Sequence, residues 1–115
     1  MTEWVVYGIK TCDSCKKLLK QCTSEGISHR FHDLRTDGLP EHQLKHWIEV
    51  LGLKALINRS STTFRALDER ERERLESQEA LQVLMAYPTL IKRPLLDTGA
   101  RLILAPKPQD LAQLS

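Results

Sequence analysis

The chain has no apolar run that approaches the roughly 20 residues of a membrane-spanning helix. Its first residues, Met1-Thr2-Glu3-Trp4, form neither a basic leader nor a cleavable apolar stretch, so we expect no signal peptide. Of its 115 residues 41% are apolar and 28% charged, which is typical of one soluble domain that can bury a core without disulfide staples. We therefore expect neither a membrane protein nor a secreted disulfide scaffold.

A strong charge of one sign is also missing, because the net charge is only +2 and does not favour a nucleic-acid partner. Residues 68–79 hold six acids and three arginines, a net charge of −3 that leaves +5 for the rest of the chain. At helical spacing these acids and arginines largely neutralise one another, which favours a solvated helix face. Part of the remaining positive charge surrounds the N-terminal cysteines, where it favours small anionic substrates.

Cysteine is sparse, with three residues in a chain for which no signal peptide is expected. This indicates a reducing, cytoplasmic compartment, in which a C-x-x-C favours redox chemistry or metal binding over a structural disulfide. Cys12 and Cys15 form such a pair between an apolar, β-branched run and a Lys-rich helical pattern. A thiol where a strand passes into a helix meets the helix's N-terminal amides and positive dipole end, and both favour the reactive thiolate.

Cys12, at the start of the helix, is the predicted nucleophile, and Lys10, Lys16 and Lys17 would help to hold its thiolate. Cys15 follows one turn later on the same face, close enough to form a disulfide with Cys12. It can be a resolving thiol, a regulatory switch or a packed residue. Cys22 lies further along the apolar stripe and is interpreted as a small buried hydrophobe.

A zinc site is the main alternative for the cysteine pair. His42 and His46 stand four residues apart, a spacing at which two histidines can bind one metal ion. However, 26 residues separate Cys15 from His42, against about 12 to 15 in a zinc finger. The histidines also lie opposite the apolar stripe of their predicted helix, so they should face solvent. We therefore expect no metal site and no bound cofactor.

Hydrophobic periodicity predicts an α/β fold in the order β-α-β, a helical block, then β-β-α. We expect one domain over residues 1–115, with a mixed-sheet core at about 1–35 and 88–115 and a helical insertion at about 36–87. The predicted elements are strands at 4–9 and 27–34, a helix at 12–25, a helix between Pro40 and Gly52, a polar loop at 58–63, helices over 68–85 with a break near Ser77, strands at 95–96 and 102–105, and a closing helix at 106–114.

The motifs Gly8-Ile9-Lys10-Thr11-Cys12-Asp13, Asn58-Arg59-Ser60 and Ile91-Lys92-Arg93-Pro94-Leu95-Leu96 resemble those of the ArsC family. This family of glutathione- and glutaredoxin-coupled arsenate reductases also includes a YffB-type branch and Spx-type regulators, and residues 31–35 and 62–67 are most similar to the YffB branch. The resemblance implies a thioredoxin-like fold with a helical insertion and a nucleophile at Cys12. It further implies substrate or anion binding by Lys10, Thr11, Arg59, Arg93 and Pro94, with a cis Arg93–Pro94 bond.

The sequence departs from the arsenate reductases in two places. Those enzymes have a third substrate-binding arginine near the last strand, where this chain has Leu104, with only Arg101 nearby. Losing one charge-assisted donor of three weakens the binding of a tetrahedral oxyanion. Those reductases also use a single N-terminal cysteine, whereas this chain adds Cys15.

The sequence therefore predicts a glutathione-linked thiol reductase that acts through the Cys12 thiolate, with glutathione as co-substrate and glutaredoxin as a further partner. Two alternatives stay open: an arsenate reductase, and a redox-responsive regulator of the Spx type that binds the RNA polymerase α subunit without turnover.

Overall fold

The computed structural model describes residues 3–107 and 109–111 of the chain. The strands are β1 (Trp4–Gly8), β2 (His29–Asp33), β3 (Leu95–Asp97) and β4 (Leu102–Leu104); the helices are α1 (Asp13–Ser24), α2 (Glu41–Leu51), α3 (Leu53–Leu56), α4 (Thr62–Ala66), α5 (Glu69–Leu75) and α6 (Ala80–Ala86), and η1 (Pro88–Leu90) is a 3-10 turn. Two compact units divide the chain: a first unit up to Asp37 and from Arg93 onward, and a second unit, Gly38–Lys92. That all 115 residues act as one domain stays a prediction.

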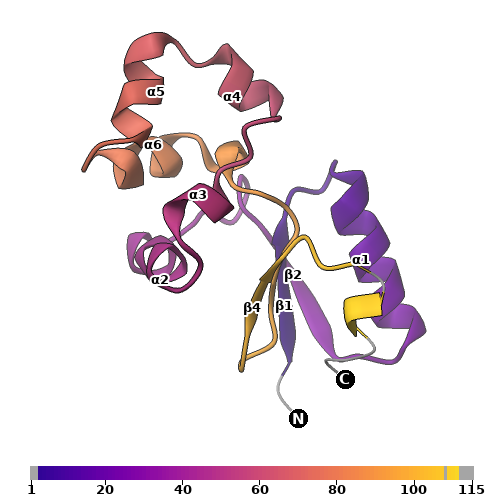
Figure 1. Ribbon diagram of the computed structural model, residues 1–115. Coiled ribbons are helices and arrows are strands. Elements are labelled where there is room, and N and C mark those ends of the chain that lie inside the picture. Colours follow the sequence, from indigo (N-terminus) through magenta and orange to yellow (C-terminus); the bar gives the residue numbers. More distant parts are fainter. Residues whose placement is uncertain (1–2, 108, 112–115) are drawn as a thin grey trace. The chain divides into compact units, whose positions relative to one another are not determined.

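The first unit is built on a four-stranded mixed sheet with the strand order β2-β1-β3-β4. β1 runs parallel to β2, with Gly8 opposite Asp33, and antiparallel to β3, with Tyr7 opposite Leu95. β4 completes the sheet as the antiparallel partner of β3. Figure 1 shows α1 beside the sheet as the connection between the parallel strands β1 and β2. The predicted β-α-β unit is thus confirmed.

Helix α1 is held against the sheet by a hydrophobic core. Leu18 and Cys22 of the helix cluster with Trp4 and Val6 of β1 and with Leu96 of β3. The Cys22 side chain is fully buried, which confirms its interpretation as a small hydrophobe. On the other face of β1, Tyr7 is buried and Val5 is half-buried, so both faces of this strand are largely covered, as its continuous apolar run predicts.

The second unit consists of helices, of which α2 is the longest. Leu44 and Trp47 of α2 are fully buried, and the helix packs against α3 and α6. α2 ends at Leu51, because the next residue, Gly52, has a φ of +88° that suits glycine. The predicted interruption near Ser77 is confirmed, since it separates α5 from α6.

Three segments differ from the sequence prediction. Helix α4 begins inside the polar loop predicted at 58–63, because the Ser61 hydroxyl accepts the Phe64 amide at 3.1 Å and thereby caps a short helix. Residues 88–90 form η1 before the chain becomes extended. Of the closing helix predicted at 106–114, residues 109–111 are helical, residues 106 and 107 are not, and the others lie outside the described residues.

Within the described part of the chain, no helix has the length and apolar character needed to cross a membrane.

Candidate functional site

Cys12 directly precedes α1 and occupies its N-cap position, in extended backbone conformation with φ −83° and ψ 119°. Its amide donates a hydrogen bond of 3.0 Å to the Ile9 carbonyl, and its carbonyl accepts the Lys16 amide at 3.1 Å. The side chain is half-buried. The sulfur is therefore partly exposed and lies at the first turn of the helix, as predicted.

The surroundings of Cys12 favour its thiolate. Partial burial opposes ionisation, but the backbone amides of Cys15 and Ser14, the Cys15 thiol and the Arg93 side chain all hydrogen-bond to the sulfur and together lower its pKa. Amides in the first turn of a helix have no partner within the helix, so they are available to an anion. The cation that contacts Cys12 is Arg93, far away in sequence, and not one of the nearby lysines that the sequence suggested.

The surroundings of Cys15 favour its protonated thiol, in contrast to those of Cys12. It is only 1% exposed, and burial raises its pKa to about 12, although a hydrogen bond from the Ile9 backbone and the charge of Arg93 act in the other direction. The nearby Cys12 thiolate raises the pKa of Cys15 further. Cys15 therefore stays protonated at neutral pH, and its S–H is a donor to Cys12.

Gly8 at the end of β1 is a residue that sequence reasoning missed. A β-carbon at this position would overlap the Cys15 sulfur, and it would lie 3.5 Å from the Phe31 ring. Only glycine therefore allows α1 and the Cys15 thiol to approach β1 this closely. The available signal was a glycine in an apolar strand pattern, which often marks a close approach to the backbone.

Arg93 and Pro94 enter the site from the other end of the first unit's sequence. The peptide bond between them is cis, which confirms the expectation from the family resemblance. Pro94 is buried, its carbonyl accepts the Ala105 amide at 2.8 Å, and β3 begins at the next residue. Because β3 pairs with β1, this arrangement brings the Arg93 side chain to the Cys12 sulfur.

The loop between β1 and α1 carries the other two predicted substrate residues, Lys10 and Thr11, and both are exposed. The Lys10 amide donates to the Asp33 carboxylate at 3.0 Å, and the Thr11 hydroxyl accepts Arg35 Nη2 at 3.4 Å. Asp33, only 3% exposed, was also missed by sequence reasoning. An acid near the end of the segment predicted as the second strand was the available signal.

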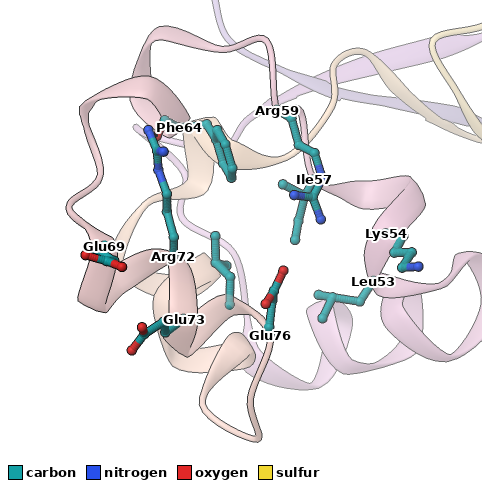
Figure 2. Close-up of a pocket in the computed structure, with 10 residues that line it drawn as sticks. Leu53, Lys54, Ile57, Arg59, Phe64, Glu69, Arg72, Glu73 and Glu76 are labelled. Carbon is teal, nitrogen blue, oxygen red and sulfur yellow. Dashed lines mark hydrogen bonds between the residues drawn. The ribbon is translucent and has the colours of Figure 1, made fainter.

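Arg59 belongs to the second unit, where it helps to line a pocket of about 660 Å³. Figure 2 shows Arg59 and Arg72 on either side of Phe64, with guanidinium carbons 5.6 and 5.0 Å from the centre of the ring. Arg72 also donates to the carbonyls of Phe64 and Arg65, at 3.4 and 3.2 Å. Anion binding by Arg59 stays a prediction.

His42 and His46 are exposed, as their position on α2 predicted. Among the described residues, no group of three or more His, Cys, Asp or Glu side chains could hold a metal ion. Leu104, at the position where arsenate reductases carry a third arginine, is half-buried in β4 and pairs with Leu95. It offers no charged donor.

Known proteins with similar sequences support a family assignment. A model of the ArsC family matches residues 7–114. An uncharacterized protein of Haemophilus influenzae is 46% identical over 99 residues, which cover 85% of this chain and 87% of the relative. The regulatory protein MgsR of Bacillus subtilis is 25% identical over 111 residues, which cover 95% of this chain and 87% of the relative.

Solved structures agree in fold. The structure of a YffB protein is 35% identical, with a TM-score of 0.88 over 96% of both chains. An arsenate reductase (ArsC) related protein from Brucella melitensis is 32% identical, with a TM-score of 0.77 over 96% of this chain and 92% of the other. These similarities confirm the predicted thioredoxin-like mixed sheet. Since the family model spans nearly the whole chain and includes both Cys12 and Arg93, this protein belongs to the ArsC family.

Proposed function

We propose that this protein is a glutathione-linked thiol oxidoreductase whose nucleophile is the Cys12 thiolate. The observation that carries the proposal is the set of donors around Cys12: two amides of α1, the Cys15 thiol and the Arg93 guanidinium, which together lower the pKa of this thiol. Membership of a family with arsenate reductase-related members supports reductive thiol chemistry. The link to glutathione rests on the family resemblance.

The reaction that fits this site is thiol–disulfide exchange. The Cys12 thiolate attacks one sulfur of a disulfide; a Cys12–sulfur bond forms, the original S–S bond breaks, and the second half leaves as a thiolate that takes a proton from water. A glutathione thiolate then attacks the sulfur bound to Cys12 and releases the Cys12 thiolate. This releases a mixed disulfide of glutathione and the substrate, which reacts with Cys12 in the same way: the substrate half leaves as a thiolate, and glutathione stays bound to Cys12. A second glutathione thiolate attacks this sulfur and releases glutathione disulfide and the Cys12 thiolate, so two glutathione molecules are oxidised for each disulfide reduced.

Cys15 is proposed to act as a hydrogen-bond donor in this cycle, not as the thiol that resolves the mixed disulfide. Its burial and its pKa of about 12 leave almost no thiolate at neutral pH, and thiolate is the attacking form. The same S–H contributes to the low pKa of Cys12. Resolution by external glutathione follows from this difference between the two thiols.

Arg93 is proposed to have two roles, because its guanidinium contacts the Cys12 sulfur and can also bind a carboxylate of the incoming substrate. Arg59 is proposed as a further anion-binding residue, on the family resemblance alone. Leu104 removes the third arginine, so we propose that disulfides are better substrates than arsenate.

Mass spectrometry after exposure to glutathione disulfide tests the proposal. Wild type and Cys15→Ser should each gain one glutathione on Cys12, whereas Cys12→Ser should gain none; Cys22→Ser is the matched control for loss of a buried thiol. Adding reduced glutathione should remove the adduct from both reactive proteins. Unchanged labelling of Cys12→Ser would overturn the assignment of the nucleophile, and a Cys12–Cys15 disulfide in wild type would make Cys15 the resolving thiol.

A redox-responsive regulator is the second candidate, because MgsR of Bacillus subtilis is a regulatory protein similar over 95% of this chain. In this role, oxidation of the cysteines would control binding to the RNA polymerase α subunit. Co-elution with the α C-terminal domain, together with no turnover of glutathione-linked disulfides, would favour the regulator over the reductase. Turnover without co-elution would favour the reductase.

A further inference from the structure

The end of β2 carries a buried carboxylate that the proposed chemistry does not use. Asp33 is 3% exposed, and its two oxygens accept three backbone amides. Oδ1 accepts the amides of Arg35 at 2.8 Å and Thr36 at 3.0 Å, while Oδ2 accepts the amide of Lys10 at 3.0 Å. Burial opposes ionisation of Asp33, but these amides outweigh burial and hold the pKa of the carboxyl well below its usual range.

The two oxygens of Asp33 bind different parts of the chain. The bonds to Oδ1 are local and close the turn that follows β2. The bond to Oδ2 joins residues 23 positions apart and reaches the loop between β1 and Cys12. A buried group that connects a local turn to a distant loop can fix the position of that loop.

Two side-chain hydrogen bonds join the loop that carries Cys12 to the turn after β2. Lys10 and Thr11 are exposed, so their side chains are not held by core packing. Besides the Asp33 bond, the turn after β2 reaches this loop through Arg35 Nη2, which donates to the Thr11 hydroxyl at 3.4 Å. The link to Asp33 is shorter, has a charged acceptor and is part-buried, whereas the link to Thr11 is exposed, so the bond to Asp33 is the stronger of the two.

We propose that Asp33 is a positioning residue for the nucleophile: its Oδ2 holds the Lys10 amide and so fixes the Lys10–Cys12 loop with the Cys12 sulfur facing its donors. This inference rests on the proposed role of Cys12. The donors that lower the pKa of Cys12 lie on α1 and at Arg93, whereas the loop leads into Cys12 from β1. If the loop shifts, the sulfur leaves these donors even though each donor is still present.

The substitution Asp33→Asn distinguishes the roles of the two oxygens. The asparagine carbonyl can still accept the amides of Arg35 and Thr36, but its NH₂ group would then meet the Lys10 amide, donor against donor. The local turn is thereby kept and the link to the loop is lost. Asp37→Asn is the matched control, because it removes one negative charge from the same turn, and its carbonyl can still accept the Asp33 amide, now bound by Asp37 Oδ2 at 2.9 Å.

The readout is alkylation of Cys12 by iodoacetamide as a function of pH, in the full chain with Cys15 and Cys22 left in place. We expect Asp33→Asn to raise the pKa of Cys12 and to slow its alkylation at pH 7 by about 10- to 100-fold, as for a misplaced reactive group. Loss of negative charge alone would lower the pKa of a nearby thiol, so charge and positioning predict opposite directions. Asp37→Asn should leave the alkylation rate within about twofold of wild type, well below the positioning effect of about 10- to 100-fold.

Three outcomes decide the proposal. A higher Cys12 pKa in Asp33→Asn but not in Asp37→Asn supports it. A lower melting temperature for Asp33→Asn with an unchanged Cys12 pKa would overturn it, since Asp33 would then act on stability alone. A Cys12 that is equally unreactive in wild type would instead sink the proposed nucleophile, and that result is distinguishable because wild type itself reports it.

A measurement on wild type covers the case in which Asp33→Asn does not fold. Lys10 and Thr11 are both exposed, but the Lys10 amide has Asp33 as acceptor, so it should exchange with solvent deuterium much more slowly than the Thr11 amide. Equal exchange of these two amides would show that the link is absent and would overturn the proposal.

Discussion

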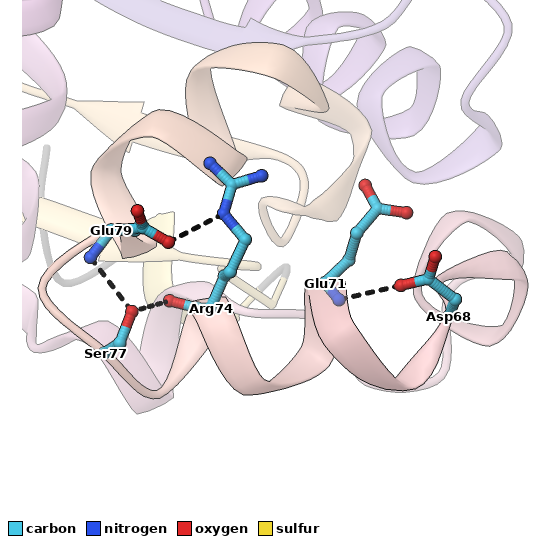
Figure 3. Close-up of polar contacts among 5 residues, drawn as sticks. All are labelled: Asp68, Glu71, Arg74, Ser77 and Glu79. Carbon is cyan, nitrogen blue, oxygen red and sulfur yellow. Dashed lines mark hydrogen bonds and ion pairs between the residues drawn. The ribbon is translucent and has the colours of Figure 1, made fainter.

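The side-chain contacts within the first compact unit differ in kind from those within the second. In the first unit, the contacts around Cys12 join residues far apart in sequence: Gly8 lies against Cys15, Lys10 bonds to Asp33, and Arg93 reaches Cys12. In the second unit, the side-chain contacts at the two ends of α5 join residues that are close in sequence. Figure 3 shows this pattern around α5, where Asp68 accepts the Glu71 amide and Arg74 pairs with Glu79.

Because of this difference, the pKa of Cys12 and the stability of the helices in the second unit should respond to different substitutions. A sulfur whose pKa depends on several distant groups changes when any of them moves. A capped helix changes mainly in its own stability, because each cap serves one helix end. Substitutions in the first unit should therefore alter Cys12, whereas substitutions in the second unit should alter stability and leave Cys12 unchanged.

The largest expected effect is that of Gly8→Ala, because the added methyl group would overlap the Cys15 sulfur. Overpacking of this kind costs about 1 to 3 kcal/mol, and here it should also displace Cys15 and raise the pKa of Cys12. Denaturant unfolding and pH-dependent alkylation measure the two effects.

The double variant Gly8→Ala, Cys15→Ala provides the control, since the smaller side chain removes the overlapping sulfur. It should recover part of the lost stability but not the low pKa of Cys12, which needs the Cys15 S–H. If the loss of stability in the double variant equals the sum of the losses in Gly8→Ala and Cys15→Ala, the two residues do not interact.

Acid should weaken the first unit through Asp33. The pKa of Asp33 is held well below its usual range in the folded protein, so its hydrogen bonds contribute full stability above the unfolded pKa of about 3.9. This contribution should be lost progressively as pH falls below that value toward the folded pKa. Melting temperatures of wild type and Asp33→Asn, compared between pH 2 and pH 6, should converge at low pH; a constant difference would contradict the prediction.

Removing a cap in the second unit should have a smaller effect. Asp68→Ala leaves the Glu71 amide, now bound at 2.8 Å, without its acceptor, and loss of an N-cap typically costs about 1 kcal/mol. The alkylation rate of Cys12 should stay that of wild type. Asp68→Asn, which preserves an acceptor, is the matched variant, and it should recover most of the stability. A clear change in Cys12 reactivity would show that the two units do not act separately.

The smallest effect is expected for the ion pair between Arg74 and Glu79. Its atoms are 2.9 Å apart, but both side chains are well exposed, at 40% and 61%. Exposed pairs contribute about 0.2 to 1 kcal/mol and are screened by salt. Glu79→Gln should therefore change the unfolding free energy by no more than this amount, and the difference should shrink in 1 M salt. A larger loss that persists in salt would contradict this interpretation.

Local patterns made much of the fold predictable. The apolar run of β1, the stripe of α1 and the glycine after α2 are properties of neighbouring residues, and the structure has these elements within a residue or two of their predicted bounds. Helix α4 is an exception, because the polar residues around it favour a loop. The Ser61 hydroxyl instead accepts the Phe64 amide and caps a short helix. The family motifs added the cis Arg93–Pro94 bond, which no local pattern indicates.

The sequence by itself determined that Cys12 stands at the N-terminal end of a helix, because this position is a local property and Cys12 directly follows a strand pattern. Only the tertiary structure decided how Cys12 and Cys15 differ. The low pKa of Cys12 depends on Arg93, which strand pairing brings across the sheet, and the high pKa of Cys15 depends on its burial beside Gly8. Burial and distant charge set these values, and neither is encoded in the spacing of two cysteines.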